Sequence, residues 1–159
     1  MRLLITGARG MLGQDVRRAA EAAGHDALGF SHAELDVTDA VAVQDALNAA
    51  APDAVVNCAA WTNVDGAEEL EPEATKINRD GAGHLARAAA AVGAWTIHVS
   101  SDYVFDGSKR QPYVESDPTG PVSAYGRSKL SGELEVADHA PTSHTIVRSS
   151  WLFGAGGPC

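Results

Sequence analysis

The stretch Gly7-Ala-Arg-Gly10-Met-Leu-Gly13 decides the fold, because it joins a short apolar run at residues 2–6 to a helical pattern that follows it. A strand, a glycine turn and a helix in this order are the context of a dinucleotide-binding fingerprint. Gly7 permits a tight turn, Gly10 lets the backbone approach a pyrophosphate, and Gly13 lets the helix pack close to the strand. The helix N-terminus would offer free N–H groups to the phosphates. The alternative is an ordinary strand–helix turn that favours glycine.

The rest of the chain alternates between strand-like apolar runs and helical patterns. We expect strands at 27–30, 52–57, 95–99 and 144–148, with 149–153 continuing the last one, and helices at 39–49, 78–92 and about 123–138. This alternation predicts an α/β fold, a doubly wound parallel sheet of the Rossmann type. The length suits one domain with a sizeable core. Together with the glycine turn, it predicts one NAD(P)-binding domain over residues 1–159. Segment 102–120 is rich in Gly, Pro and Asp and is long enough to be a functional loop or lid.

Charge and composition exclude several classes of function. The formal net charge is −9 and no long basic run occurs, so we expect no binding to nucleic acid or to anionic membranes. No apolar segment approaches the roughly 20 residues that span a bilayer, and the first apolar run is too short for a signal peptide. The chain is therefore expected to be soluble and cytoplasmic. Cys58 is interpreted as a buried reduced thiol and Cys159 as an exposed one without a role, and no His/Cys cluster has metal-ligand spacing.

Tyr125 and Lys129 are four residues apart, which places both side chains on one face of a helix. A ketone accepts hydride only when its oxygen is stabilised and protonated, and a free tyrosine, with a pKa of about 10, is poorly matched to neutral pH. We expect the lysine ammonium to lower the pKa of the tyrosine and to hold the nicotinamide ribose. Ser101, at the end of an apolar strand, would supply a second hydrogen bond to the carbonyl oxygen. Ser100 competes for that role, because strand alternation lets only one of the two face the cleft.

Other candidate residues have alternative interpretations that the sequence leaves open. The strand at 27–30 is followed by Ser31 and His32, neither the acid that favours NADH nor the Arg that favours NADPH. Asp36 and Val37 would either flank the adenine of a bound dinucleotide or begin the next helix. Trp61 lines the cleft or packs under the following loop.

Asn78 bonds backbone near the site or faces solvent. An acidic cluster, interpreted as a solvated helix start rather than a metal site, comprises Glu68, Glu69, Glu71 and Glu73.

Six segments together resemble a known family. They are Ile5–Gly13, Pro52–Thr62, Val64-Asp65, Ser100-Ser-Asp-Tyr-Val-Phe-Asp-Gly107, Tyr125–Lys129 and Arg148-Ser-Ser-Trp-Leu-Phe153. The glycine turn and the Tyr/Lys pair specify the extended short-chain dehydrogenase/reductases. The fourth and sixth segments narrow the resemblance to the dTDP-4-dehydrorhamnose reductase family within them.

The resemblance implies an activity and a set of site residues. The activity would be reduction of the 4-keto group of dTDP-4-dehydro-L-rhamnose by NADPH or NADH, giving dTDP-L-rhamnose. Ser101, Tyr125 and Lys129 would be catalytic, and Ser101, Asp102 and Trp151 would contact the nucleotide sugar. The implied cofactor positions are Gly7, Gly10, Met11, Leu12, Gly13, Asp36, Val37, Ala60, Trp61, Thr62, Val99, Tyr125 and Lys129.

The resemblance also implies that family members extend well beyond 159 residues. The chain is therefore expected to be the cofactor half of a reductase without its substrate domain. A strand edge left uncovered would favour pairing, which is compatible with a homodimer. Two alternatives remain: a non-catalytic regulatory subunit similar to the methionine adenosyltransferase beta subunit, and a nucleotide-sugar epimerase or dehydratase, for which Asp102 beside Ser101 would serve as the acid.

Overall fold

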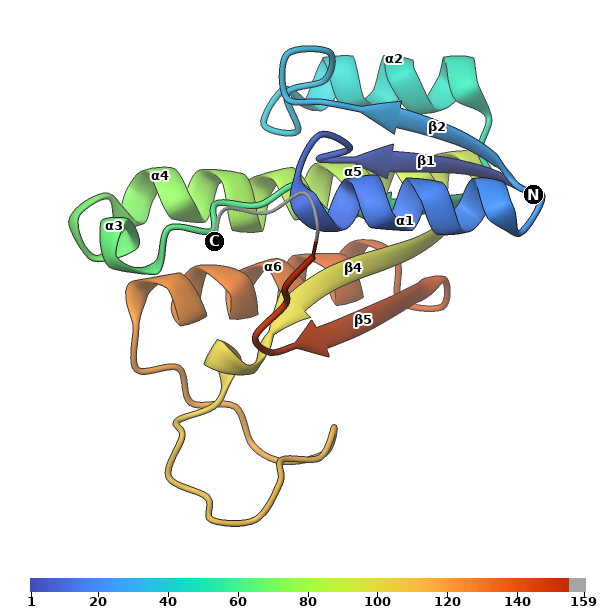
Figure 1. Cartoon of the computed structure of the whole chain (residues 1–159). Helices are drawn as coiled ribbons and strands as arrows, with labels where there is room; N and C mark the ends of the chain where they lie inside the picture. The colour runs from blue at the N-terminus through green and yellow to red at the C-terminus, as the bar shows by residue number, and fades with distance from the viewer. Residues whose placement is uncertain (155–159) are drawn as a thin grey trace.

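The computed structural model describes residues 1–154, and Cys159 lies outside this range. Five strands alternate with helices along the chain, as predicted (Figure 1). The strands are β1 (Arg2–Thr6), β2 (Asp26–Phe30), β3 (Ala54–Asn57), β4 (Trp95–Ser101) and β5 (His144–Ser149). The helices are α1 (Met11–Ala22), α2 (Ala40–Ala50), α3 (Val64–Glu69), α4 (Glu71–Thr75), α5 (Gly81–Val92) and α6 (Ala124–His139), with a π-helical turn at Lys76–Asp80 and a 3₁₀ turn at Asp102–Val104.

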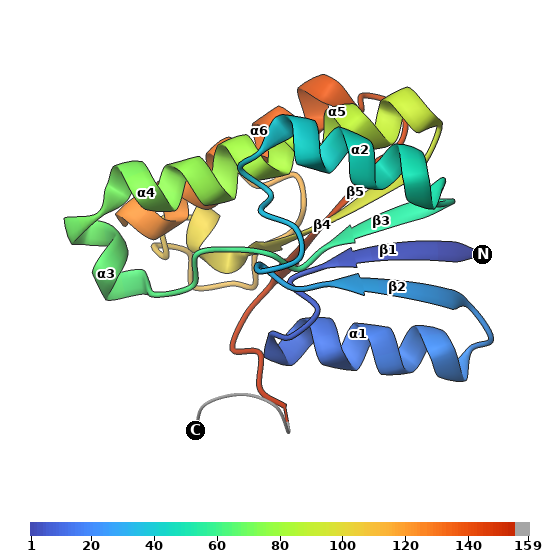
Figure 2. The same cartoon turned by 90° about the horizontal axis from the view of Figure 1, so that it is seen from above.

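All strands are parallel and lie in the order β2-β1-β3-β4-β5. Leu4 of β1, for example, pairs with Leu28 on one side and Val55 on the other. Helix α1 lies on one face of the sheet and α2, α5 and α6 lie on the other (Figure 2). The chain leaves β1 towards β2 on one side and reaches β3 on the other, so the order reverses between β1 and β3. Open α/β sheets bind ligands at such a switch point, outside the carboxyl ends of the strands.

The main core lies between the sheet and the helices α2 and α5. Val43, Leu47 and Leu85 are fully buried against Leu4 and Val55. Full burial of such side chains stabilises the fold by about 1.5–3 kcal/mol each. The small residues of α5, mostly Ala and Gly, allow this helix to pack closely against the sheet.

One prediction about the last strand is wrong. Residues 150–153 do not continue β5, which ends at Ser149. Trp151 has a left-handed backbone, with φ of 52°, and this conformation cannot extend a strand. Its side chain is 91% exposed. Within residues 1–154, none of the helices has the length and hydropathy needed to cross a membrane.

Candidate active site

Close approach of the backbone requires glycine at Gly7 and Gly13 of the first turn, and leaves little room for a side chain at Gly10. Gly7 has φ of +66°, and a Cβ there would lie 2.8 Å from backbone atoms of Cys58 and Ala59. A Cβ at Gly13 would collide with the Gly7 carbonyl, and one at Gly10 would lie 3.2 Å from the same oxygen. The turn is therefore packed against the end of β3 and against the start of α1, with the N-terminal N–H groups of α1 facing the carboxyl edge of the sheet. This is the cradle that a pyrophosphate requires.

A buried hydrogen-bond network fixes the loop that faces this cradle. The Asn57 side-chain oxygen accepts from Thr6 Oγ1 at 2.8 Å and from the Ala59 backbone N–H at 3.1 Å. The Asn57 amide nitrogen lies 3.1 Å from His98 Nδ1. Burial lowers the pKa of His98 to about 3, so the ring is neutral and accepts at Nδ1. The ends of β1, β3 and β4 are thereby held in register beneath the loop after β3.

A cleft of about 1490 Å³ opens along the carboxyl ends of the strands. Every predicted cofactor or substrate residue except Trp61 lines it: Gly7, Gly10, Met11, Leu12, Gly13, Asp36, Val37, Ala60, Thr62, Val99, Ser101, Asp102, Tyr125, Lys129 and Trp151. Residues that are far apart in the chain therefore meet in one site, as the switch-point rule predicts.

Helix α6 is positioned by contacts at its first turns. Ser123 caps it by accepting from the Gly126 N–H at 3.1 Å, and Glu68 accepts from the Ala124 N–H at 2.8 Å. Arg127 donates two 2.8 Å hydrogen bonds to the carboxylate of Glu71. Two members of the predicted acidic cluster therefore hold α6 in place rather than being merely solvated. Within residues 1–154 no group of three potential metal ligands is found.

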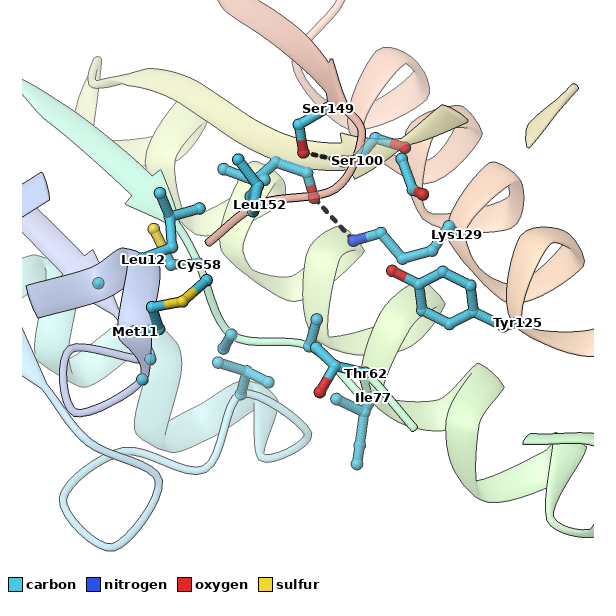
Figure 3. A pocket seen from close by; sticks show the side chains of 18 of the residues that line it. Met11, Leu12, Cys58, Thr62, Ile77, Ser100, Tyr125, Lys129, Ser149 and Leu152 are labelled. Carbon is cyan, nitrogen blue, oxygen red and sulfur yellow. Dashed lines mark hydrogen bonds between the residues drawn. The ribbon is translucent and has the colours of Figure 1, made fainter. Parts of the chain in front are cut away.

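The side chains of Tyr125 and Lys129 project from α6 into the cleft, on the side opposite Met11 and Leu12 (Figure 3). Lys129 is 2% exposed, and its ammonium donates to the Val99 carbonyl oxygen at 2.7 Å. Burial lowers the pKa of Lys129 to about 8, against the opposing effects of Glu133 and Cys58. The ammonium still predominates at neutral pH.

The expected lowering of the Tyr125 pKa is not found. Burial raises the pKa of Tyr125, a hydrogen bond with Ser101 opposes that rise, and the nearby charge of Asp102 adds to it. The reason is geometric: Lys129 is bonded to the strand backbone, and burial of the phenol disfavours its anion. Tyr125 is therefore a neutral phenol at pH 7, the form that can donate a proton.

Both Ser100 and Ser101 line the cleft, contrary to the expectation that only one would do so. The strand ends at Ser101, where the 3₁₀ turn begins, and strict alternation stops there. Ser101 Oγ accepts from the Tyr103 N–H at 3.2 Å and donates to Asp102 Oδ1 at 3.1 Å. The other Asp102 oxygen accepts from Ser150 Oγ at 2.7 Å. Ser101 also lies close enough to Tyr125 to oppose part of the rise in the pKa of that phenol, so it is the better placed of the two serines.

The sequence left open where the side chains of Asn78 and Trp61 lie, and the structure places both. Asn78 is buried, accepts from the Trp61 N–H at 2.9 Å and donates to Ser128 Oγ at 2.8 Å. It therefore bonds backbone near the site. Trp61 does not line the cleft: its ring packs on Ala67, Ala74 and Ala124, and its indole N–H donates to the Asn63 carbonyl. The cofactor position predicted for this side chain is not supported by its placement.

Asp36 lines the cleft and accepts from the Thr38 N–H at 2.9 Å, whereas Asp39 caps helix α2. The alternative that Asp36 begins that helix is therefore wrong. Cys58 is half-buried rather than buried and lines the cleft, and burial raises its pKa to about 11, so it is a thiol.

Several lining residues are absent from the sequence prediction. They include Arg9, Ser31, His32, Leu35, Ile77, Ser149, Leu152 and Phe153. Arg9 lies within the glycine stretch, and Ser31 and His32 directly follow β2. All three could therefore have been predicted as cleft residues from their positions in the sequence. Ile77 lies in a π-helical turn, and nothing in its local sequence marks it.

Comparison with known proteins gives a consistent assignment. The family model described as RmlD substrate binding domain matches residues 1–158. A dTDP-4-dehydrorhamnose reductase of Streptomyces griseus is 46% identical over 157 residues, which are 99% of this chain and 52% of the relative. A dTDP-4-keto-6-deoxy-D-glucose reductase of Streptomyces niveus is 42% identical over 98% of this chain and 54% of the relative. The chain thus spans about half the length of the relatives it matches.

Solved structures agree with this assignment. The dTDP-4-dehydrorhamnose reductase of Bacillus anthracis in complex with NADP superposes with a TM-score of 0.95 at 37% identity, over 99% of this chain and 56% of that one. The UDP-glucose 4-epimerase of Brucella ovis in complex with NAD gives a TM-score of 0.85 at 22% identity, over 92% of this chain and 51% of that one, and shows the fold alone. With the family model matching nearly the whole chain, the protein belongs to the RmlD substrate binding domain family, among relatives named dTDP-4-dehydrorhamnose reductase.

Proposed function

We propose that this chain forms the cofactor-binding and catalytic part of a reductase. The reaction is reduction of the 4-keto group of dTDP-4-dehydro-L-rhamnose with NADPH or NADH, which gives dTDP-L-rhamnose. One observation carries the proposal: Ser101, Tyr125 and Lys129 line the same cleft as the glycine cradle. The names of the relatives supply the sugar nucleotide, and the Bacillus anthracis protein was crystallised with NADP.

The residues present fit a dinucleotide. The glycine turn leaves no room for side chains at Gly7 or Gly13, and the start of α1 faces the cleft. Met11 and Leu12 would contact the phosphates through backbone N–H groups of the first helical turn. Thr62, Ala60 and Val99 would lie along the dinucleotide where β3 and β4 end. When bound, the reduced nicotinamide supplies the hydride for the carbonyl carbon.

Side chains of this protein would donate the proton and orient the ketone. Tyr125, kept neutral by burial, donates its phenolic proton to the carbonyl oxygen as negative charge develops there. The Ser101 hydroxyl supplies a second hydrogen bond to the same oxygen, for which it must leave Asp102. The Lys129 ammonium, which lies close to the end of β4, would bind a ribose hydroxyl in place of the Val99 carbonyl. Asp102 and Trp151 would contact the sugar nucleotide.

The test is a turnover assay of the full-length protein with NADPH or NADH and dTDP-4-dehydro-L-rhamnose, followed by NMR of the sugar product. We expect cofactor oxidation coupled one-to-one to dTDP-L-rhamnose. The same assay with cofactor deuterated at the transferring carbon should place deuterium at C4 of the sugar. Release of an epimer or a dehydrated sugar without net cofactor oxidation would contradict the proposal.

The dehydratase alternative is less well supported, because the carboxylate of Asp102 accepts from both Ser101 and Ser150. Both carboxylate oxygens are therefore engaged by hydroxyl groups of the chain rather than free to act on a substrate. The regulatory-subunit alternative predicts tight cofactor binding without turnover, and the same assay distinguishes it.

A further inference from the structure

The loop between β4 and α6 is anchored to the rest of the molecule close to its start. It runs out from the end of β4 and returns to the first turn of α6 (Figure 1). Of its residues 102–123, Val104 and Phe105 are buried, and the others are half-buried or exposed. The Val104 carbonyl accepts from the Gly120 N–H at 2.9 Å, which ties the start of the loop to its end. The packing of these two buried residues therefore decides where the loop leaves the sheet.

The start of the loop also forms part of the cleft wall. Asp102 and Tyr103 line the cleft. The ring of Tyr103 meets that of Tyr125 edge-on, with centroids 5.4 Å apart and planes at 80°. A Cβ at Gly126 would lie 2.2 Å from the Tyr103 carbonyl oxygen, so the loop packs directly on the first turn of α6. A shift of the loop start would therefore move the cleft wall beside the proposed proton donor.

Arg148 connects this loop start to the catalytic helix. It lies on β5 in register with Ser100 of β4. Its Nε and Nη2 atoms donate to the two carboxylate oxygens of Glu133 on α6, at 2.9 and 2.7 Å. Its Cζ atom also lies 4.9 Å from the centroid of the Phe105 ring. One side chain of β5 therefore contacts both α6 and one of the two buried residues of the loop.

The two contacts of Arg148 use different parts of the guanidinium. A planar guanidinium can bind a carboxylate through one edge while its face lies against an aromatic ring, which the ammonium of a lysine cannot reproduce. The Phe105 ring in turn stacks on Tyr113 further along the loop, with centroids 4.2 Å apart. An ion pair that only attached β5 to α6 would not require an aromatic ring of the loop against the guanidinium.

We propose that Arg148 is a positioning residue for the reductase reaction: oriented by Glu133, it fixes Phe105 and thereby places Asp102 and Tyr103 at the cleft wall. Arg148 acts through the loop, because it is not itself among the residues that line the cleft. The inference rests on the proposed function, since it requires that the cleft accept a sugar nucleotide. The glycine turn that would hold the cofactor lies at the other end of the cleft, so binding of the substrate should depend on Arg148 and binding of the cofactor should not.

The test is steady-state kinetics of the full-length protein with dTDP-4-dehydro-L-rhamnose, together with calorimetric titration with NADPH and NADH. Arg148→Lys keeps a positive charge beside Glu133 and removes the planar face, whereas Phe105→Leu keeps the ion pair and removes the ring. We expect each variant to raise KM for the sugar nucleotide about tenfold, with kcat changed less than about threefold and cofactor affinity less than about twofold. Arg18→Lys, an exposed substitution on α1 outside the cleft, is the control and should change none of these quantities.

Hydrogen exchange of the same proteins, followed by NMR, tests the loop itself. The amide protons of Phe105 and Gly120 are bonded to the Asp102 and Val104 carbonyls, at 3.0 and 2.9 Å. They should exchange about tenfold faster in Arg148→Lys and in Phe105→Leu, because the loop start opens more often. The Ala8 amide proton, in the glycine turn, should exchange at an unchanged rate.

Three results would overturn the inference. They are an unchanged KM in both folded variants, an equal weakening of substrate and cofactor binding, and an unchanged exchange rate at Phe105 and Gly120. Each would leave Arg148 a stabilising residue only. Normal turnover by the unmodified protein would keep the proposed function intact in all three cases, whereas lack of turnover with either cofactor would contradict both.

Discussion

Lys129 donates a 2.7 Å hydrogen bond to the carbonyl oxygen of Val99, the residue that precedes the two serines at the end of β4. The bond joins helix α6 to the strand that carries Ser101. It fixes the ammonium at the cleft and leaves the phenol of Tyr125, one helical turn earlier, without a cationic neighbour strong enough to lower its pKa. This contact between α6 and β4 therefore orients the predicted cation beside the predicted acid.

Substitution of Tyr125 by Phe should remove the proton donor while leaving the cleft intact. We expect kcat of the proposed reductase reaction to fall by about 10²–10⁴, the usual contribution of a positioned general acid. The affinity for NADPH should change less than about threefold, because the ring is retained. Steady-state kinetics and calorimetry measure the two quantities. Activity within threefold of the unmodified enzyme would show that another group supplies the proton.

Gly10→Val should abolish binding of NADPH and NADH without unfolding the chain. A Cβ at this position already lies 3.2 Å from the Gly7 carbonyl, and the branched side chain would extend to where the pyrophosphate must lie. Calorimetric titration gives the affinity, and circular dichroism confirms that the variant is folded. Unchanged affinity in a folded variant would exclude the glycine turn from the cofactor site.

The pH dependence of stability should reveal the buried lysine. The folded pKa of Lys129 is about 8, below its ordinary value of 10.5, so the unfolded chain binds more protons between these values. The free energy of unfolding contributed by Lys129 should therefore rise as pH increases from about 8 to 10.5, by at most about 3 kcal/mol. Cys58 and Tyr125, whose pKa values are raised, act in the opposite direction in the alkaline range.

The measurement is urea unfolding at pH 8, 9 and 10 for the unmodified chain and for Lys129→Met. Because the variant retains Cys58 and Tyr125, the difference between the two proteins isolates the lysine. The stability advantage of the variant should shrink as pH rises. A difference that does not depend on pH would mean that Lys129 titrates normally.

Much of the fold and most of the site could be predicted from local sequence. Glycine spacing, apolar runs and the Tyr/Lys interval depend on neighbouring residues, so the cradle at Gly7 and the helix bearing Tyr125 were predictable. The direction of the Tyr125 pKa was not, because it depends on burial and on where the Lys129 side chain bonds after folding. The packing of Trp61 depends on contacts with α3, α4 and α6 that no local pattern specifies.

The end of β5 also could not be predicted from the local sequence. Apolar residues at 151–153 favoured a longer strand, but Trp151 adopts a left-handed backbone and the chain turns away from the sheet. Ile77 lies in a π-helical turn, so it does not follow the 3.6-residue spacing of the helix α5 that comes next. Its position in the cleft could therefore not be predicted from helical spacing.

The last prediction concerns two ion pairs with the same geometry and different burial. Arg148 donates to both carboxylate oxygens of Glu133, at 2.9 and 2.7 Å, and the glutamate side chain is 5% exposed. Arg127 bonds Glu71 in the same bidentate way, with side chains 45% and 41% exposed. The guanidinium of Arg148 also lies 4.9 Å from the ring of Phe105, in the loop that follows β4.

Arg148→Met should leave the buried Glu133 carboxylate without its guanidinium partner and lower the free energy of unfolding by about 3–5 kcal/mol. Arg127→Met, the matched control, should cost no more than about 1 kcal/mol, because water replaces the lost partner. Adding Glu133→Leu to Arg148→Met should recover most of the loss, since the unpaired charge is then removed. Urea unfolding of the three variants measures these differences. Equal costs for the two arginine substitutions would show that burial of Glu133 does not govern the energetics of α6 against β5.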